Sequence, residues 1–193
     1  MSRLQSRAKT YLIPLIRGEW RQIDEYARKA IAAWAAMTTM IIECRDPATR
    51  ATIAAEREFL AKHLSLPMNW YVWVGVCTAP RWAHGFNHFG FGGRRELEIQ
   101  DDGTSRVVAQ SECQEQSTAF VLERLFVLTF SSRVGARRID PQAFAKVHGL
   151  RWVDAAEEWI RPETTLDDEH ADAISSTFVP DAMRSFVRHA WET

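Results

Sequence analysis

Apolar positions along the chain change their spacing twice, and these changes divide it into three parts. From Glu19 to about Glu43 the apolar residues recur every three or four positions, which is the spacing of one face of an α-helix. The second half of this stretch is apolar on nearly every face, which predicts a central, buried helix. The pair Asp46-Pro47, a capping residue followed by proline, predicts the start of a second helix that runs to about Leu64.

The middle of the chain has the pattern of β-strands. The segment Trp70–Val76 is β-branched and aromatic and apolar on both faces, which predicts a buried strand. Leu97 and Ile99 alternate with charged residues before a turn sequence at 101–103, which predicts a hairpin. The apolar run Thr118–Phe130 is typical of one long or bent strand. We therefore expect an antiparallel meander.

The two ends of the chain have weaker patterns. Ser2–Ile16 is basic and apolar, and we expect Pro14 to limit any helix there. Asp140-Pro141 repeats the helix-start pattern, and Pro180–Trp191 has a helical apolar stripe. The expected fold is a single α+β domain over 1–193, with an antiparallel β meander packed against a long buried N-terminal helix and further helices. Its helical part covers 1–66, its sheet 67–132 and its helical C-terminal part 133–193.

Composition narrows the class of protein. The chain is 46% hydrophobic and 25% charged with a net charge of −1, which is ordinary for a soluble globular protein and weak as an attraction for nucleic acid. The three cysteines are far apart and form no C-x-x-C pair, so they favour reduced thiols over a zinc or disulfide framework. Polar residues follow Met1, and no apolar run reaches the roughly 20 residues of a membrane span. We expect a cytoplasmic protein with no membrane contact.

Charge is unevenly distributed along the sequence. Residues 1–29 hold seven basic and three acidic side chains, whereas residues 154–172 hold eight acidic side chains and one arginine. Both segments are consistent with solvated helix faces, and both are alternatively contact faces for a partner. Leu166-Asp167 also predicts a helix start, where carboxylates interact favourably with the helix dipole. The candidate acidic partner-binding face is Glu157, Glu158, Asp167, Asp168 and Glu169.

The stretch RWAHGFNHFGFGG, Arg81 to Gly93, has the most suggestive chemistry. His84 and His88 would share a metal ion on a helix, but the four glycines argue against a helix, and four residues of strand span about 13 Å. We expect these histidines to be structural, with metal binding as the alternative. The aromatic residues fit a strand in the core, or alternatively an exposed platform that stacks bases or anchors a protein. No phosphate-binding loop or dinucleotide motif is present, so we expect no cofactor.

Arginines flank this stretch and follow the last predicted strand. Arginine on a glycine-containing loop reaches phosphates, although a solvated loop has the same composition. The candidate nucleic-acid or partner-binding residues are Arg81, Trp82, Arg94, Arg95, Arg133, Arg137 and Arg138.

Several short segments together resemble one family: Met1–Gln5, Tyr11–Gly18, Ala33–Met40, Trp70–Gly75, Trp152 and Trp159–Pro162. They combine a proline and a glycine, a Trp-Ala helix, a Val-Trp strand that ends in glycine, and a Trp element near proline. In this they resemble the region that follows the zinc-ligand motif in bacterial HNH-type endonuclease-like proteins. The family's paired cysteines and His-Asn-His residues lie upstream of this region, so the resemblance carries no catalytic residue over to this chain.

The resemblance implies a non-catalytic binding protein that acts on a nucleic-acid-handling complex. It would be an accessory subunit of a bacterial defence system or a mobile-element inhibitor of the anti-CRISPR kind, bound to a protein complex or to nucleic acid. A metal-dependent hydrolase or nuclease that uses His84 and His88 is the alternative from another class. A structural homodimer that buries surplus aromatic residues is the third.

Overall fold

A computed structural model of the protein describes residues 3–20, 22–83, 85–93, 113–134, 139–154, 161–162 and 164–180, and the backbone of 95–99 and 105–110. The helices are α1 (Arg3–Ile16), α2 (Glu25–Ile42), α3 (Ala54–His63), α4 (Pro141–Val147) and α5 (Asp168–Ser175), with short 3₁₀ turns η1 (Glu43–Arg45), η2 (Pro47–Thr49) and η3 (Pro80–Trp82). The strands are β1 (Trp70–Cys77), β2 (Phe86–Phe91), β3 (Arg95–Ile99), β4 (Ser105–Gln110), β5 (Glu115–Leu122), β6 (Leu125–Ser132), β7 (Arg151–Trp152) and β8 (Thr165–Leu166).

The expected α+β class is confirmed, with six strands in one open sheet. Its strand order is β2-β5-β6-β1-β7, and β8 lies parallel to the end of β1. The order differs from a simple meander because β5 and β6 are inserted between β1 and β2. Two of the strands, β7 and β8, come from the C-terminal part that was expected to be helical.

The apolar run Thr118–Phe130 is two strands, so the prediction of one long strand was wrong. The antiparallel strands β5 and β6 pair over their whole length, from Glu115 with Ser132 to Leu122 with Leu125. Glu123 makes the turn with a left-handed backbone (φ 50°). A turn without glycine, asparagine or proline has no ordinary sequence signature, which explains the error.

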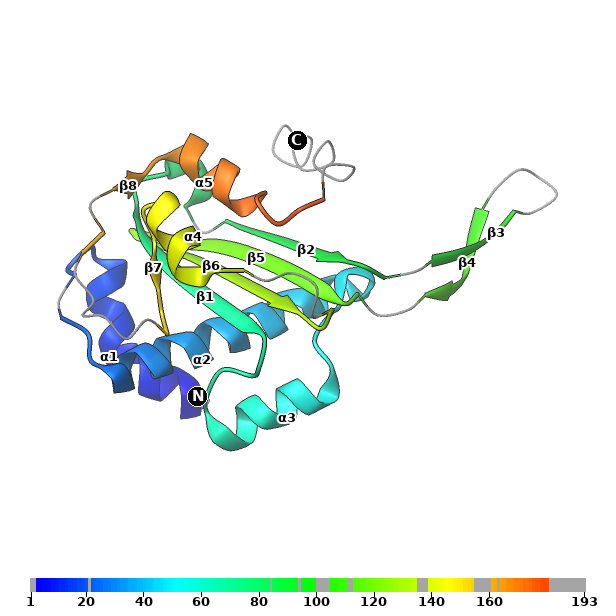
Figure 1. Ribbon diagram of the computed structural model, residues 1–193, viewed down its shortest axis with the longest axis horizontal. Helices are drawn as coiled ribbons and strands as arrows, with labels where there is room; N and C mark the ends of the chain where they lie inside the picture. The colour runs from blue at the N-terminus through cyan, green and yellow to red at the C-terminus, as the bar shows by residue number, and fades with distance from the viewer. Residues whose placement is uncertain are drawn as a thin grey trace.

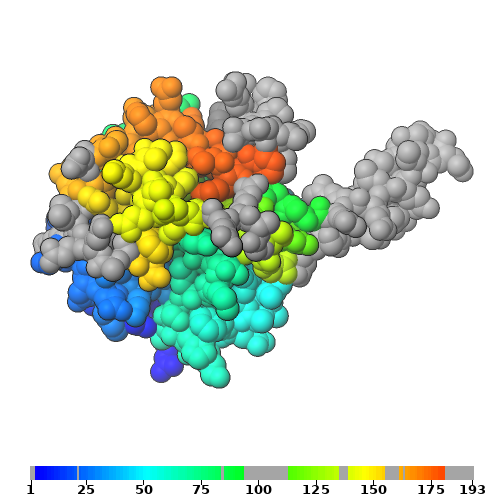
Figure 2. All heavy atoms as spheres, viewed as in Figure 1, coloured from blue at the N-terminus to red at the C-terminus, as the bar shows by residue number. Residues whose placement is uncertain are grey.

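Helices cover both faces of this sheet (Figure 1). On one face, α1 and α2 pack against alternate residues of β1 and β6, such as Val72, Val74 and Val127. On the other face, α4 and α5 pack over an aromatic core in which Phe178 stacks on Phe130 at 4.4 Å between ring centroids. Figure 2 shows α4 and α5 side by side on this second face, where Phe144 of α4 stacks on Phe178, which follows α5 in the chain. The resulting body has three layers.

The N-terminal helices differ in detail from the sequence pattern. Pro14 does not prevent α1, which runs to Ile16 and buries Leu4, Ala8, Leu12 and Leu15. The buried helix predicted from Glu19 begins at Glu25, because Asp24 caps it by accepting from the Ala27 amide at 2.7 Å. The Asp46 cap starts only the short turn η2, and α3 begins seven residues after Pro47 rather than at it.

Strands β3 and β4 form the predicted hairpin, separate from the main sheet. Among the strands that the structure describes they pair only with each other, from Ile99 with Ser105 to Arg95 with Gln110, with an irregularity next to Glu96 and Leu97. This β3–β4 ribbon is inserted between β2 and β5 in the sequence, and Figure 1 shows that it extends away from the three-layered body.

Candidate functional site

The basic candidates that the structure describes lie at opposite ends of strand β2. Arg81 belongs to η3, which precedes the strand. Arg133 lies at the other end, because its neighbour Ser132 pairs with Glu115 and Glu115 pairs with Phe91, the last residue of β2. Six strand residues span about 17–20 Å, so Arg81 and Arg133 do not form one continuous surface. The side chains of Arg94, Arg95, Arg137 and Arg138 lie outside the described residues.

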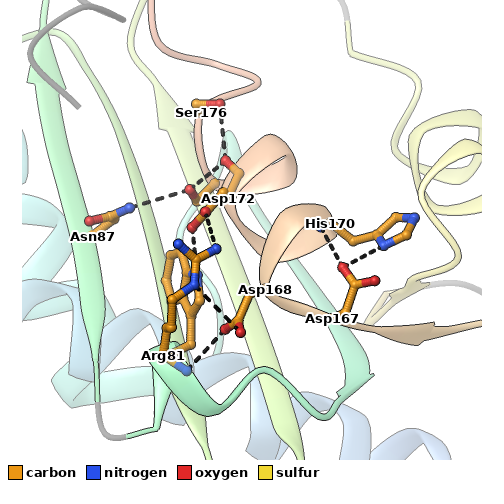
Figure 3. Close-up of polar contacts among 9 residues, drawn as sticks. Arg81, Asn87, Asp167, Asp168, His170, Asp172 and Ser176 are labelled. Carbon is orange, nitrogen blue, oxygen red and sulfur yellow. Dashed lines mark hydrogen bonds and ion pairs between the residues drawn. The ribbon is translucent and has the colours of Figure 1, made fainter. Parts of the chain in front are cut away.

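Arg81 is held by helix α5 in a group of residues that we call the η3–α5 junction: Arg81, Trp82, Asp168 and Asp172 (Figure 3). The Asp168 carboxylate accepts from the Arg81 backbone amide at 3.0 Å and lies 3.5 Å from its guanidinium. The Asp172 carboxylate accepts from the Arg81 guanidinium at 2.9 Å and from the Trp82 indole at 2.8 Å. The basic and acidic candidate faces of the sequence are therefore partly bonded to each other.

Trp82 is a core residue. It is 1% exposed and packs edge-on against Phe126, with ring centroids 6.2 Å apart. Trp82 therefore cannot serve as an exposed platform that stacks bases or anchors a protein, and its place among the partner-binding candidates is corrected. Phe91 is also buried, so the expected core packing of this aromatic stretch is confirmed for these two residues.

The described acidic candidates mainly serve helix α5. Asp167 is its N-cap, accepting from the His170 amide at 2.9 Å and from the His170 imidazole at 2.7 Å. These hydrogen bonds, that of the backbone amide first, lower the pKa of Asp167. The predicted helix start at Leu166-Asp167 is confirmed. Glu169 is exposed, and Glu157 and Glu158 lie outside the described residues.

His88 sits on β2 in a polar environment. Its Nδ1 atom and the Thr118 hydroxyl are 2.7 Å apart. Burial lowers the pKa of His88 to about 4, against smaller opposing effects of the Thr49 backbone and the Asp46 charge. The imidazole is therefore neutral at pH 7. Its proposed metal partner His84 lies outside the described residues, and no three His, Cys, Asp or Glu side chains gather as a metal site in the part of the chain that the structure describes.

His88 belongs to a buried polar cluster at one end of the sheet, on the face that α2 covers. The Thr129 hydroxyl is 2.7 Å from that of Thr39 on α2, and Gln116 donates to the Thr52 hydroxyl at 2.9 Å. Thr118 lies between His88 and Thr129, because it pairs with both of them across the sheet. These contacts join the sheet to the segment between α2 and α3 and rigidify both.

Glu43 holds the same segment in place and was not among the candidates. Its side chain is fully buried, accepts from the amides of Ala51 and Thr52 at 3.1 Å each, and pairs with the Arg57 guanidinium at 2.8 Å. These amide bonds fix residues 51 and 52, which lie just before the N-cap of α3 at Ile53. No pattern near Glu43 indicates this role. For Asp172, by contrast, the four-residue spacing from Asp168 indicates that both side chains lie on the same face of a helix.

Comparison with protein-family models, with curated proteins and with solved structures finds no match to this chain. None of the described helices is long and apolar enough to cross a membrane. The described candidate residues thus make mainly structural contacts, and one described element, the β3–β4 ribbon, lies apart from the packed body.

Proposed function

We propose that the protein acts by binding another macromolecule, and that the β3–β4 ribbon is its main contact element. The observation that carries this proposal is the separation of the ribbon from the six-stranded sheet. An isolated two-stranded ribbon is at best marginally stable in water, so it gains most from a partner that covers one of its faces.

The register of the ribbon supports a contact with a protein. It pairs Leu97 with Val107 and Ile99 with Ser105, so these four positions share one face, and it pairs Glu98 with Arg106. Three of these four positions are apolar and the pair on the other face is charged, which is the sequence pattern of a strand that packs on one side. The acids Glu96, Glu98, Asp101 and Asp102 outnumber the arginines over 95–110, which disfavours phosphates as the main target.

The biological setting of the proposal rests on the sequence resemblance alone. A region similar to the one that follows the zinc motif of HNH-type proteins favours a protein component of a nucleic-acid-handling complex in bacterial defence or counter-defence, in the cytoplasm. Arg94, Arg95 and Arg133 are the proposed contacts near the base of the ribbon, because they adjoin the ends of β2 and β6 in the sequence.

The test is a variant without the ribbon. Strands β2 and β5 are antiparallel neighbours, so replacing residues 94–112 by a short Asn-Gly turn should join them as a hairpin and leave the body folded. Quantitative co-purification from the native host should show specific proteins with the wild type that the ribbonless variant loses, and these proteins should bind purified wild type directly. The proposal would be overturned if the same proteins co-purified with the wild type and the ribbonless variant. It would also be overturned if the ribbonless variant still bound nucleic acid, seen as a mobility shift with a steep salt dependence.

A further inference from the structure

Strand β2 is an edge of the main sheet, and the direction of its outer backbone groups follows from its bonds to β5. The Val121 amide donates to the Gly85 carbonyl at 3.2 Å, and the Gln114 amide donates to the Phe91 carbonyl at 2.9 Å. Backbone groups alternate between the two sides of a strand. Since residues 85, 87, 89 and 91 face β5, the amides and carbonyls of Phe86, His88 and Gly90 face outward.

This outer row has no strand beside it in the part of the chain that the structure describes. The strand order ends at β2, and no backbone hydrogen bond joins Phe86, His88 or Gly90 to another described segment on that side. The opposite edge of the sheet is formed by two strands of only two residues each, β7 and β8. β2 is therefore the longer edge, and the one able to pair with a further strand.

The composition of β2 lacks the usual protection of an edge strand. Its sequence, FNHFGF, contains no lysine, no other charged residue at neutral pH and no proline. Edge strands of natural proteins are normally blocked by such residues, and an unblocked edge is a template for strand addition. An extended backbone is thus the ligand that this edge fits.

From these observations we infer that β2 pairs antiparallel with β2 of a second copy of this chain, which makes a two-fold symmetric dimer with one continuous sheet. In one register, every outward backbone amide and carbonyl of β2 forms a hydrogen bond with the second copy. This register places His88 opposite His88 of the second copy and Phe86 opposite Gly90. Gly90 has no side chain of its own, and the backbone of Thr49 lies where its Cβ atom would be. The strand is uncharged, so the pairing brings no like charges together.

Charge at the two ends of β2 favours this partner. At the strand's beginning, Asn87 donates to Ser175 of α5 at 3.3 Å, so α5 lies beside that end. At that end, the acidic residues of α5 and its N-cap outnumber the basic residue Arg81. Beyond the other end, Arg94 and Arg95 follow in the sequence. Antiparallel pairing brings the arginine end of one copy to the acidic end of the other, which is the self-complementarity that a two-fold interface requires. The acidic residues are Asp167, Asp168, Glu169 and Asp172.

This inference does not depend on the function proposed for the ribbon, and the experiment separates the two. The interface is one strand wide, so we expect weak association with a Kd on the order of 10–100 μM. Sedimentation velocity should show a dimer that dissociates on dilution, for the wild type and for the ribbonless variant alike. Loss of the dimer in the ribbonless variant alone would place the interface on the ribbon instead and would overturn the inference.

Amide hydrogen exchange on the wild type is the decisive readout. The amides of Phe86, His88 and Gly90 should become protected as the concentration rises, whereas those of Asn87 and Phe89, which bond to β5, should not change. Protection of the outer amides at every concentration would mean that the chain covers its own edge. Rapid exchange at every concentration would mean that the edge stays open, and either result overturns the inference.

A substitution gives an independent check. Phe89→Lys adds a charge to the edge strand and should weaken the dimer at least tenfold, whereas Phe59→Lys adds the same charge on α3 and should not. Both variants should be checked for folding by circular dichroism. If Phe89→Lys does not fold, the exchange experiment on the wild type alone decides.

Discussion

The indole N–H of Trp82 donates to a carboxylate oxygen of Asp172 at 2.8 Å, so a buried core residue is bonded to a side chain that is 41% exposed. This bond fastens α5 to the body. We expect Asp172→Ala to lower the free energy of unfolding by about 1–2 kcal/mol, because the indole loses this acceptor. Urea denaturation followed by tryptophan fluorescence measures the change. Glu169→Ala on the same helix is the control and should change stability by less than about 0.5 kcal/mol.

Replacement of Glu43 should be more damaging. Its buried carboxylate serves two backbone amides and Arg57, and Glu43→Ala removes the acceptor of all three. We expect a loss of about 3 kcal/mol in the free energy of unfolding. Glu43→Gln keeps an oxygen acceptor and should lose less. Equal losses for the two variants would contradict the role given to these hydrogen bonds.

Gly90 should not tolerate a side chain. A Cβ atom at this position would lie 2.0 Å from the carbonyl oxygen of Thr49, which is a backbone atom and does not move easily. We expect Gly90→Ala to destabilise the protein by about 3 kcal/mol or to prevent folding. At Gly92 the same substitution meets only ordinary contacts at 3.5 Å but a φ of +79°, so it should cost about 1 kcal/mol. Thermal denaturation of the two variants should reproduce this order.

His88 should make stability depend on pH. Its folded pKa of about 4 lies below the ordinary histidine pKa of 6.5, so the unfolded chain binds more protons between these two values. Stability should therefore be flat above about pH 7 and fall as the pH drops toward 4. Between pH 7 and pH 5 the contribution of His88 to this loss is about 2 kcal/mol. His88→Gln should remove that part of the slope, and an unchanged slope would contradict the burial of the imidazole.

Local features of the fold were predictable from the sequence where local chemistry decides them. The buried strand Trp70–Cys77 follows from its β-branched and aromatic residues, and the caps Asp140 and Asp167 start α4 and α5 as expected. The ribbon was also expected from the alternation around Leu97. In each case the sequence signal and the structure involve residues only a few positions apart.

Features that depend on distant residues were not predictable. The insertion of β6 between β1 and β5 is a long-range pairing, in which Trp73 meets Leu128. The segment before α3 is held by Glu43, which lies eight residues before the first amide that it binds. The bonds between Arg81 and the acidic α5 join residues that the sequence indicated as two separate contact faces.

The proposal that the β3–β4 ribbon makes the contact through which the protein acts can be tested by the affinity of a purified partner for three chains. These are the wild type, the ribbonless variant and Glu169→Ala, measured by calorimetry at matched salt. We expect the partner to bind the wild type and Glu169→Ala equally and the ribbonless variant at least 100-fold more weakly. Equal binding of a folded ribbonless variant would contradict it.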